Sequence, residues 1–251
     1  MGRRRPQPSR VAVVTGGGSG IGEATCHHLT EHGHRVAIVD IDGDGAERVA
    51  KAVEAEGGNA IAVHADVTDR RAVDAAFAAT VAALGPVEVL VTSAGICPFT
   101  PFADITLDEW NLAIDVNLTG TFLGARAGAA RMGEGGRIIV TGSVLGDRPH
   151  GLLAAYSASK GGAHALVRAL AQELGPRKIT ANVVALGWFD TGLGAHWRRD
   201  ENRDKDVVSH TALARWGTAA DLPGVYLFLA SDASAYVTGT TITVDGGYSL
   251  L

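Results

Sequence analysis

Short runs of β-branched residues alternate with longer amphipathic stretches along almost the whole chain of 251 residues. This alternation is typical of βαβ units, in which parallel strands are buried on both faces. Seven strands separated by helices predict an α/β fold, a doubly wound Rossmann-type parallel sheet with helices on both faces. The expected strands are Val11 to Val14, Arg35 to Val39, Ala60 to His64, Val87 to Val91, Arg137 to Thr141, Ile179 to Val184 and Thr241 to Val244.

The intervening helices and the chain ends complete the expected organisation. Residues 1–9 are basic and contain prolines, which indicates a disordered tail, and residues 10–251 are expected to form a single Rossmann-type domain. Residues 188–211 interrupt the alternation with glycines and a charged run, which fits a flap over a substrate cleft or a solvated surface helix. The expected helices are roughly Gly20 to His32, Gly45 to Glu56, Arg70 to Leu84, Leu107 to Met132, Ala155 to Leu174 and Ala219 to Ser231.

Composition limits the classes of partner and site. A net charge of -5 and the lack of an apolar run of membrane-spanning length argue against nucleic-acid or membrane partners, so a cytoplasmic protein is expected. Cys26 and Cys97 are the only cysteines, which excludes a disulfide framework and a cysteine zinc site. The spacing of His28 and His32 could suit a metal on a helix, but no further ligand completes a known arrangement, and no metal is predicted.

A glycine-rich octet, Thr15 to Gly22, directly follows the first expected strand and opens the first helix. Glycines let the backbone turn tightly and approach a pyrophosphate, and a helix N-terminus offers free N–H groups and a positive dipole end. Both flanking elements that this motif requires are present, so a dinucleotide site is predicted. Its expected contacts in the octet are Gly16, Gly18, Ser19, Gly20, Ile21 and Gly22.

Asp40 ends the second strand about 20 residues beyond the glycine turn, and Ile41 follows it. Its carboxylate can accept hydrogen bonds from both adenosine ribose hydroxyls and would repel the 2′-phosphate of NADP. No Lys or Arg lies within the glycine loop to compensate, so the predicted cofactor is NAD; the alternative is a turn or cap role for Asp40. Asp66 and Val67, just after the third strand, are expected beside adenine, with capping of the next turn as the alternative for Asp66.

Tyr156 and Lys160 lie four residues apart, on one face of an expected helix. The ordinary pKa of tyrosine is about 10, and a nearby ammonium would lower it, making the phenol a usable acid and base. Ser143, thirteen residues before Tyr156, supplies a hydroxyl that can hold a substrate oxygen. Taken alone, the pair also fits a packed tyrosine beside a solvated lysine.

The glycine octet, Asp40 and the order Ser143, Tyr156, Lys160 together make residues 10–250 resemble the short-chain dehydrogenase/reductase family. The resemblance implies that Tyr156 is the acid/base of hydride transfer and that Lys160 also binds the nicotinamide ribose. It implies that Asn117 is a fourth catalytic residue, holding a water on a proton route from the lysine; the compatible alternative is a helix-kink residue. It further implies a homotetramer through the helices that contain Asn117 and Tyr156. The remaining expected cofactor contacts are Ser93, Ala94, Gly95, Gly187, Phe189 and Thr191.

Two segments depart from the pattern of that family. Thr92-Ser93-Ala94-Gly95 stands where Asn-Asn-Ala-Gly is usual, so local hydrogen bonds are expected to be rebuilt or lost while the close approach of Gly95 is kept. Leu186-Gly187-Trp188 stands where Pro-Gly is usual, and loss of the fixed proline φ is expected to loosen that turn.

The substrate is expected among segments that follow the strand ends, and these are mostly apolar or aromatic. They predict a small to medium hydrophobic or cyclic secondary alcohol or ketone. The alternatives are a reductase of 3-oxoacyl thioesters on the same fold and a non-catalytic dinucleotide-binding sensor. The expected walls are Cys97, Phe99, Val144, Leu145, His150, Leu152, Leu153, Trp188 and residues 192–210, and the expected substrate contacts are Ser143, Leu145, Leu153, Tyr156 and Trp188.

Overall fold

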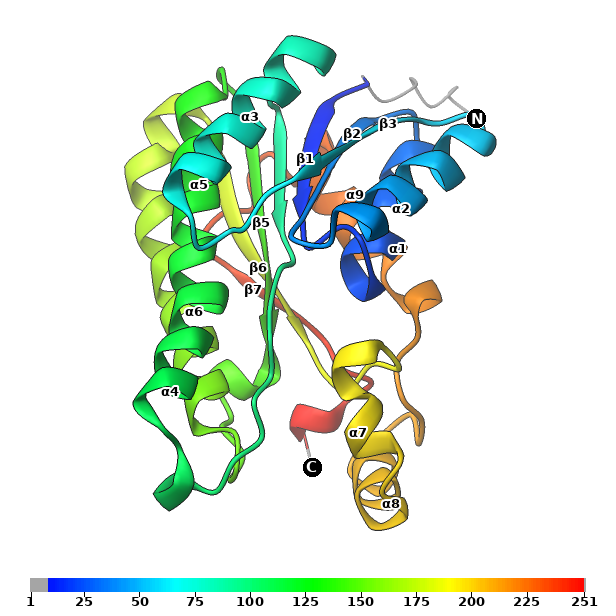
Figure 1. The fold of residues 1–251 in the computed structure, drawn as a ribbon, viewed down its shortest axis with the longest axis vertical. Helices are drawn as coiled ribbons and strands as arrows, with labels where there is room; N and C mark the ends of the chain where they lie inside the picture. Colours follow the sequence, from blue (N-terminus) through cyan, green and yellow to red (C-terminus); the bar gives the residue numbers. More distant parts are fainter. Residues whose placement is uncertain (1–8, 251) are drawn as a thin grey trace.

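One parallel sheet of seven strands organises the computed structural model, which describes residues 9–250 except for the side chains of residues 195 and 196. The strand order is β3-β2-β1-β4-β5-β6-β7 (Figure 1). This order confirms the doubly wound fold, and it reverses direction between β1 and β4, which is where such sheets form their ligand crevice. The strands are β1 (Val11–Thr15), β2 (Arg35–Asp40), β3 (Asn59–His64), β4 (Val89–Thr92), β5 (Arg137–Ser143), β6 (Thr180–Leu186) and β7 (Thr241–Val244). The tail predicted for residues 1–9 lies, apart from residue 9, outside the described residues.

Helices cover both faces of the sheet (Figure 1). One face carries α1 (Gly20–Glu31), α2 (Gly43–Ala55) and α9 (Pro223–Ala230), and the other carries α3 (Arg70–Leu84), α5 (Gly120–Arg131) and α6 (Ala154–Leu174). None of the helices in the described part of the chain is long and apolar enough to cross a membrane.

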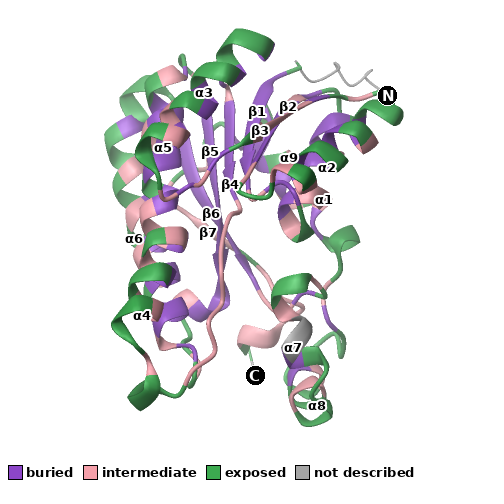
Figure 2. Cartoon of the chain, in the orientation of Figure 1, coloured by how far each residue is buried: buried purple, intermediate pink, exposed green. Residues whose placement is uncertain are grey.

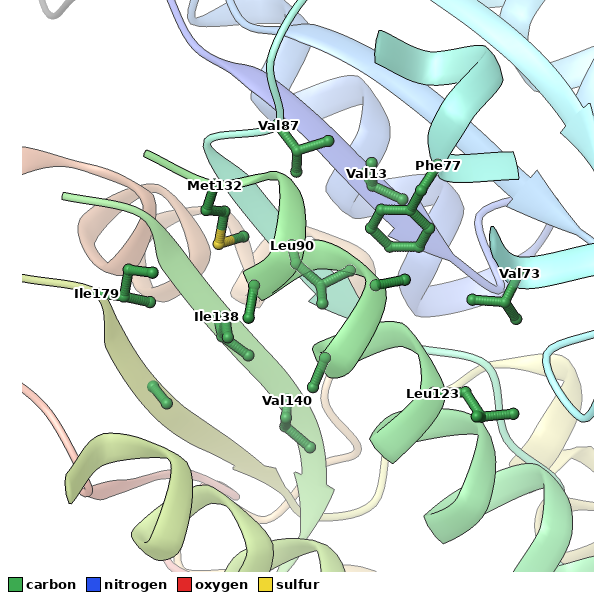
Figure 3. Close-up of a cluster of buried hydrophobic side chains, with 14 of the residues drawn as sticks. Val13, Val73, Phe77, Val87, Leu90, Leu123, Met132, Ile138, Val140 and Ile179 are labelled. Atoms are coloured by element: carbon green, nitrogen blue, oxygen red, sulfur yellow. The ribbon is translucent and has the colours of Figure 1, made fainter. Parts of the chain in front are cut away.

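The two faces of the sheet bury separate apolar clusters, and Figure 2 shows the central strands buried between the helices, while the edge strands β3 and β7 are less buried. On the α3–α5–α6 side, Phe77 packs with Leu90 and Ile138 from the central strands (Figure 3). On the opposite side, Ile38 of β2 is buried with Leu29 of α1. Burial on both faces explains why inner strands such as β1 and β4 are nearly continuous apolar runs rather than alternating ones.

The helix expected from Leu107 to Met132 is divided. The structure has α4 (Leu107–Ile114), a π-helical turn at Asp115–Thr119 and then α5. A π turn is one residue wider than an α-helical turn and is often found at functional sites. This widened turn carries Asn117, whose side chain leaves the helix to bind the backbone of another segment.

The helix expected from Ala219 to Ser231 starts later than predicted. Residues Ala219–Asp221 form a short 3-10 turn closed by a capping box between Thr218 and Asp221. The α-helix α9 begins at Pro223, where the missing N–H of proline costs no helical hydrogen bond.

Residues 188–211 contain two short helices, α7 (Ala195–Arg198) and α8 (Glu201–Ser209), which lie below the carboxyl ends of the strands in Figure 1. The Asp200 side chain caps α8 by accepting hydrogen bonds from the N–H groups of Asn202 and Arg203. Trp197 and Val207 are buried while the charged residues between them are mostly exposed. The segment therefore combines a solvated outer surface with an apolar inner one.

Candidate active site

A cavity of about 580 Å³ lies at the carboxyl ends of the strands. It brings together almost every site residue predicted from the sequence; Gly18, Asn117 and Leu153 lie outside its lining. The predicted residues that line it are Gly16, Ser19, Gly20, Ile21, Gly22, Asp40, Ile41, Asp66, Val67, Ser93, Ala94, Gly95, Ser143, Leu145, Tyr156, Lys160, Gly187, Trp188, Phe189 and Thr191.

The glycine turn between β1 and α1 forms one end of this cavity. Gly16 has a φ of +69°, and a Cβ there would lie 2.5 Å from the backbone nitrogen of Ala94, so only glycine fits. A Cβ on Gly22 would lie 2.0 Å from the carbonyl oxygen of Gly16. No side chain of the described residues caps the first turn of α1 at Ser19. The turn therefore fits a dinucleotide pyrophosphate, because its free N–H groups and the helix dipole can hold an anion.

Asp40 is held in a fixed orientation beside the glycine turn. Its Oδ2 accepts a hydrogen bond of 2.8 Å from the N–H of Gly18, and its Oδ1 accepts one of 2.9 Å from the N–H of Asp42. Gly18 thus contributes by orienting Asp40 rather than by lining the cavity. Asp40 therefore has the turn role considered as the alternative, and its place in the lining of the cavity is compatible with the predicted cofactor contact.

The sequence did not predict that Arg48 lies near the glycine turn that Asp40 braces. Arg48 donates a hydrogen bond of 2.9 Å to the carbonyl oxygen of Gly18 and pairs with both carboxylate oxygens of Glu23 at 2.6 and 2.9 Å. Arg48 lies on α2, far from the glycine loop in sequence, so inspection of the loop alone could not find it. Its charge is balanced by Glu23, and this hydrogen-bonded arginine lowers the pKa of the Glu23 carboxyl.

Asp66 has the capping role considered as an alternative. Its Oδ1 accepts hydrogen bonds of 2.8 Å from both the N–H and the hydroxyl of Thr68. It also lines the cavity together with Val67, so capping and a place beside the cofactor site are compatible.

The Ser143, Tyr156 and Lys160 side chains meet at the other end of the cavity. Ser143 ends β5, and the first two turns of α6 carry Tyr156 and Lys160. Lys160 Nζ donates a hydrogen bond of 2.9 Å to the carbonyl oxygen of Thr141 and lies 5.7 Å from the centre of the Tyr156 ring. The lysine is therefore packed against the tyrosine and the sheet, and the alternative of a solvated lysine is wrong.

Burial dominates the electrostatics of this pair. It raises the pKa of Tyr156 well above the ordinary value, and the hydrogen bond with Ser143 opposes only part of that rise. Burial also lowers the pKa of Lys160 to about 8. The expectation that Lys160 lowers the pKa of Tyr156 is therefore wrong for the chain alone, because desolvation disfavours the charged form of each group.

Asn117 connects two segments behind the cavity. It is 1% exposed, and its side chain makes two hydrogen bonds of 2.9 Å with the backbone of Ile96, one donated by the Ile96 N–H and one accepted by the Ile96 carbonyl. Its Nδ2 also donates to Ser159 Oγ at 3.0 Å, and Ser159 Oγ donates to the carbonyl oxygen of Tyr156. Asn117 thus joins the strand-four loop to the helix of the tyrosine.

The two unusual segments have different outcomes. Thr92 Oγ1 is buried and has no hydrogen-bond partner among the described residues, so the bonds of the usual amide are lost there rather than rebuilt. The turn after β6 is pinned by the backbone instead of by proline. The Gly187 N–H donates a hydrogen bond of 3.0 Å to the carbonyl oxygen of Val244. The Gly217 N–H donates one of 2.9 Å to the carbonyl oxygen of Trp188. These bonds argue against the expected loosening.

Aromatic side chains close the substrate end. Trp188 and Trp197 both line the cavity, with ring centres 4.7 Å apart. Phe99 and His150 do not line the cavity, but both contact the Trp197 ring. Their ring centres lie 4.9 and 5.6 Å, respectively, from that of Trp197. The expected contact Leu153 is fully buried and lies behind the lining. Trp197 was not singled out in the sequence, although a tryptophan immediately before a charged run was the available signal.

Comparisons with known proteins agree with this geometry. A family model described as enoyl-(acyl carrier protein) reductase matches residues 16–249. The 3-oxoacyl-[acyl-carrier-protein] reductase MabA of Mycobacterium tuberculosis is 38% identical over 99% of this chain and 96% of its own length. An L-rhamnose 1-dehydrogenase (NAD(P)(+)) of Azotobacter vinelandii is 36% identical over 95% of this chain and 96% of its own length. The solved short-chain dehydrogenase/reductase of Serratia marcescens superposes with a TM-score of 0.92 at 34% identity, covering 98% of this chain and 100% of that chain.

Proposed function

The chain belongs to the short-chain dehydrogenase/reductase family and is an oxidoreductase, and from this premise we propose that it transfers a hydride between NAD(H) and a small to medium hydrophobic or cyclic secondary alcohol or ketone. One observation carries the proposal: a single cavity joins the glycine turn and Asp40 to Ser143, Tyr156 and Lys160. The nicotinamide dinucleotide used by this family supplies the hydride carrier when bound.

In the proposed reaction, this chain's own residues orient the substrate and manage one proton. Ser143 holds the substrate oxygen by a hydrogen bond, and Tyr156 gives or takes the proton of that oxygen. Burial favours the neutral phenol, which is the form that donates a proton during ketone reduction. Lys160 is held by its hydrogen bond to the carbonyl oxygen of Thr141 near the end of β5. Asn117 holds the loop after β4 by its hydrogen bond with the Ile96 backbone.

Asp40 supports NAD as the preferred cofactor. The hydrogen bonds from Gly18 and Asp42 hold its carboxylate in the cavity lining beside the glycine turn, where it would repel the 2′-phosphate of a cofactor bound with its adenosine there. Arg48 is the nearby candidate to neutralise a phosphate, but it is paired with Glu23. The name of the Azotobacter relative includes both nicotinamide cofactors, so the ratio between them must be measured for this chain.

A 3-oxoacyl thioester reductase is the second candidate, favoured by the activity that the name of the Mycobacterium relative gives; the family model is described by a different reduction of acyl-carrier-protein substrates. The aromatic closure formed by Trp188 and Trp197 supports a compact substrate instead. A non-catalytic sensor is the weakest alternative, because Asn117, Ser143, Tyr156 and Lys160 are all retained.

The proposal includes a cytoplasmic homotetramer. The helices around Asn117 and Tyr156 are the expected contact, and Leu112 and Phe122 on α4 and α5 are exposed apolar side chains that such a contact could cover. Sedimentation analysis would report the assembly directly.

The function is tested by Tyr156→Phe, which keeps the ring and removes the hydroxyl. We expect this variant to retain NAD binding, measured by fluorescence titration. Its turnover, measured in a screen of secondary alcohols and ketones with both cofactors, should fall about 100-fold or more. Tyr226→Phe is the matched control, because Tyr226 is also buried and its hydroxyl makes a 2.9 Å hydrogen bond with Thr141. A Tyr156→Phe variant with the turnover of Tyr226→Phe would refute the assignment.

A further inference from the structure

The wall of the cavity at Trp197 depends on residues that do not themselves line it. Trp197 is 4% exposed and contacts Trp188 on its inner side, while the edge-to-face contact with Phe99 joins it to the loop between β4 and α4. That loop and the α7–α8 segment descend separately from the sheet in Figure 1. The Phe99–Trp197 contact therefore connects two walls of the substrate end that come from distant parts of the chain.

Arg203 of α8 adds a second connection between these walls. Its guanidinium carbon lies 4.4 Å from the centre of the Phe99 ring and 5.0 Å from the centre of the Trp197 ring. Both distances are within the range of a cation–π interaction, and the guanidinium plane can stack on aromatic faces. Asp200, at the start of the same helix, lies 3.5 Å from Arg203 Nε and orients the side chain.

The position of this cluster limits the shape of the substrate. Cys97 and Trp197 line the cavity, and Phe99 and Arg203 lie outside that lining. When an extended acyl thioester binds, its long carrier group must leave the cavity through an opening. The contacts that join the loop of Phe99 to α8 narrow the opening that is left for this group. A compact ring has no such requirement.

We propose that Arg203 is a positioning residue that latches α8 to Phe99 and Trp197, and so selects compact cyclic or aryl alcohols and ketones against extended 3-oxoacyl thioesters. This inference rests on the proposed function of the same site. The latch acts through Trp197 and takes no part in proton or hydride transfer.

The kinetic test compares cyclohexanone with acetoacetyl-CoA as substrates, using NADH. In Arg203→Leu we expect kcat/KM for acetoacetyl-CoA relative to that for cyclohexanone to rise about fivefold, the combined effect of two partly exposed cation–π contacts, mainly through KM. Phe99→Leu should give the same rise, and the double variant should give little more, because both changes open one latch. Arg203→Lys keeps the charge and should restore part of the selectivity.

Lys205→Ala is the matched control, since it removes one positive charge from the exposed side of α8. If Arg203→Leu leaves the ratio at the level of Lys205→Ala, or if it lowers activity with acetoacetyl-CoA because the arginine holds the phosphates of that substrate, the latch is refuted.

A second measurement is independent of turnover. Acrylamide quenching of tryptophan fluorescence should increase in Arg203→Leu, and the increase should disappear when Trp197→Phe is the background. Unchanged quenching overturns the latch even if no substrate is turned over. Failure of the wild-type chain to act on either substrate would instead count against the proposed function, so the two failures can be distinguished.

Discussion

Replacing the buried Asn117 by alanine removes three hydrogen bonds of its side chain at once. Two of them hold the backbone of Ile96, and the third holds Ser159 Oγ, which in turn bonds the carbonyl of Tyr156. At about 1 kcal/mol for each hydrogen bond, the free energy of unfolding should fall by about 3 kcal/mol. The loop at Ile96 and the helix of Tyr156 would no longer be joined, and a shift of about 1 Å can reduce turnover about 100-fold.

Asn182→Ala separates the loss of stability from the loss of position. Asn182 is equally buried, but its two hydrogen bonds join β6 to residues 237 and 240, and it does not line the cavity. Urea unfolding followed by circular dichroism should show about 2 kcal/mol of destabilisation for this control, while kcat at low denaturant stays near wild type. Equal kcat for the two variants, both fully folded in the assay, would refute the idea that Asn117 positions the site.

Two further predictions concern charge. Asp40→Ser should raise the ratio of kcat/KM with NADP to that with NAD about tenfold or more, because the carboxylate that would repel the 2′-phosphate is removed; an unchanged ratio in steady-state assays would contradict this role. Burial lowers the pKa of Lys160 from 10.5 to about 8, so between these values the unfolded chain binds a proton that the folded chain has released, and this lysine makes the free energy of unfolding rise with pH. The free energy of unfolding of wild type minus that of Lys160→Met should therefore rise as the pH increases from about 8 to 10.5. If urea unfolding at several pH values gives a constant value for this quantity, the assigned pKa shift is refuted.

Patterns confined to a few neighbouring residues carried most of the correct predictions. The β-branched runs located all seven strands; the inner strands are mostly apolar because they are buried on both faces, whereas the edge strands β3 and β7 are only partly buried. The octet from Thr15 to Gly22 located the close approach at Gly16, because its φ and the contact with Ala94 both require glycine. The order and spacing of Ser143, Tyr156 and Lys160 along the chain were enough to predict that they meet in one cavity.

The features that the sequence did not predict depend on contacts between distant segments. The π turn at Asn117 is stabilised by Ile96, which lies 21 residues earlier, and the Arg48 contact to the glycine turn spans 30 residues. The contact between Phe99 and Arg203 joins segments even further apart. Helical periodicity contains no information about any of these pairs, since each requires the packed sheet to bring its members together.

The pair Tyr156 and Lys160 shows why the electrostatics also could not be read from spacing. Four residues along a helix place the ammonium near the phenol, but burial of the whole pair favours the neutral form of both groups. In the proposed reaction, the chain by itself therefore supports proton donation by Tyr156 during ketone reduction. Alcohol oxidation needs the phenolate, and a bound oxidised nicotinamide would favour that form by its positive charge. The proximity of Lys160 therefore does not by itself set the pKa of Tyr156.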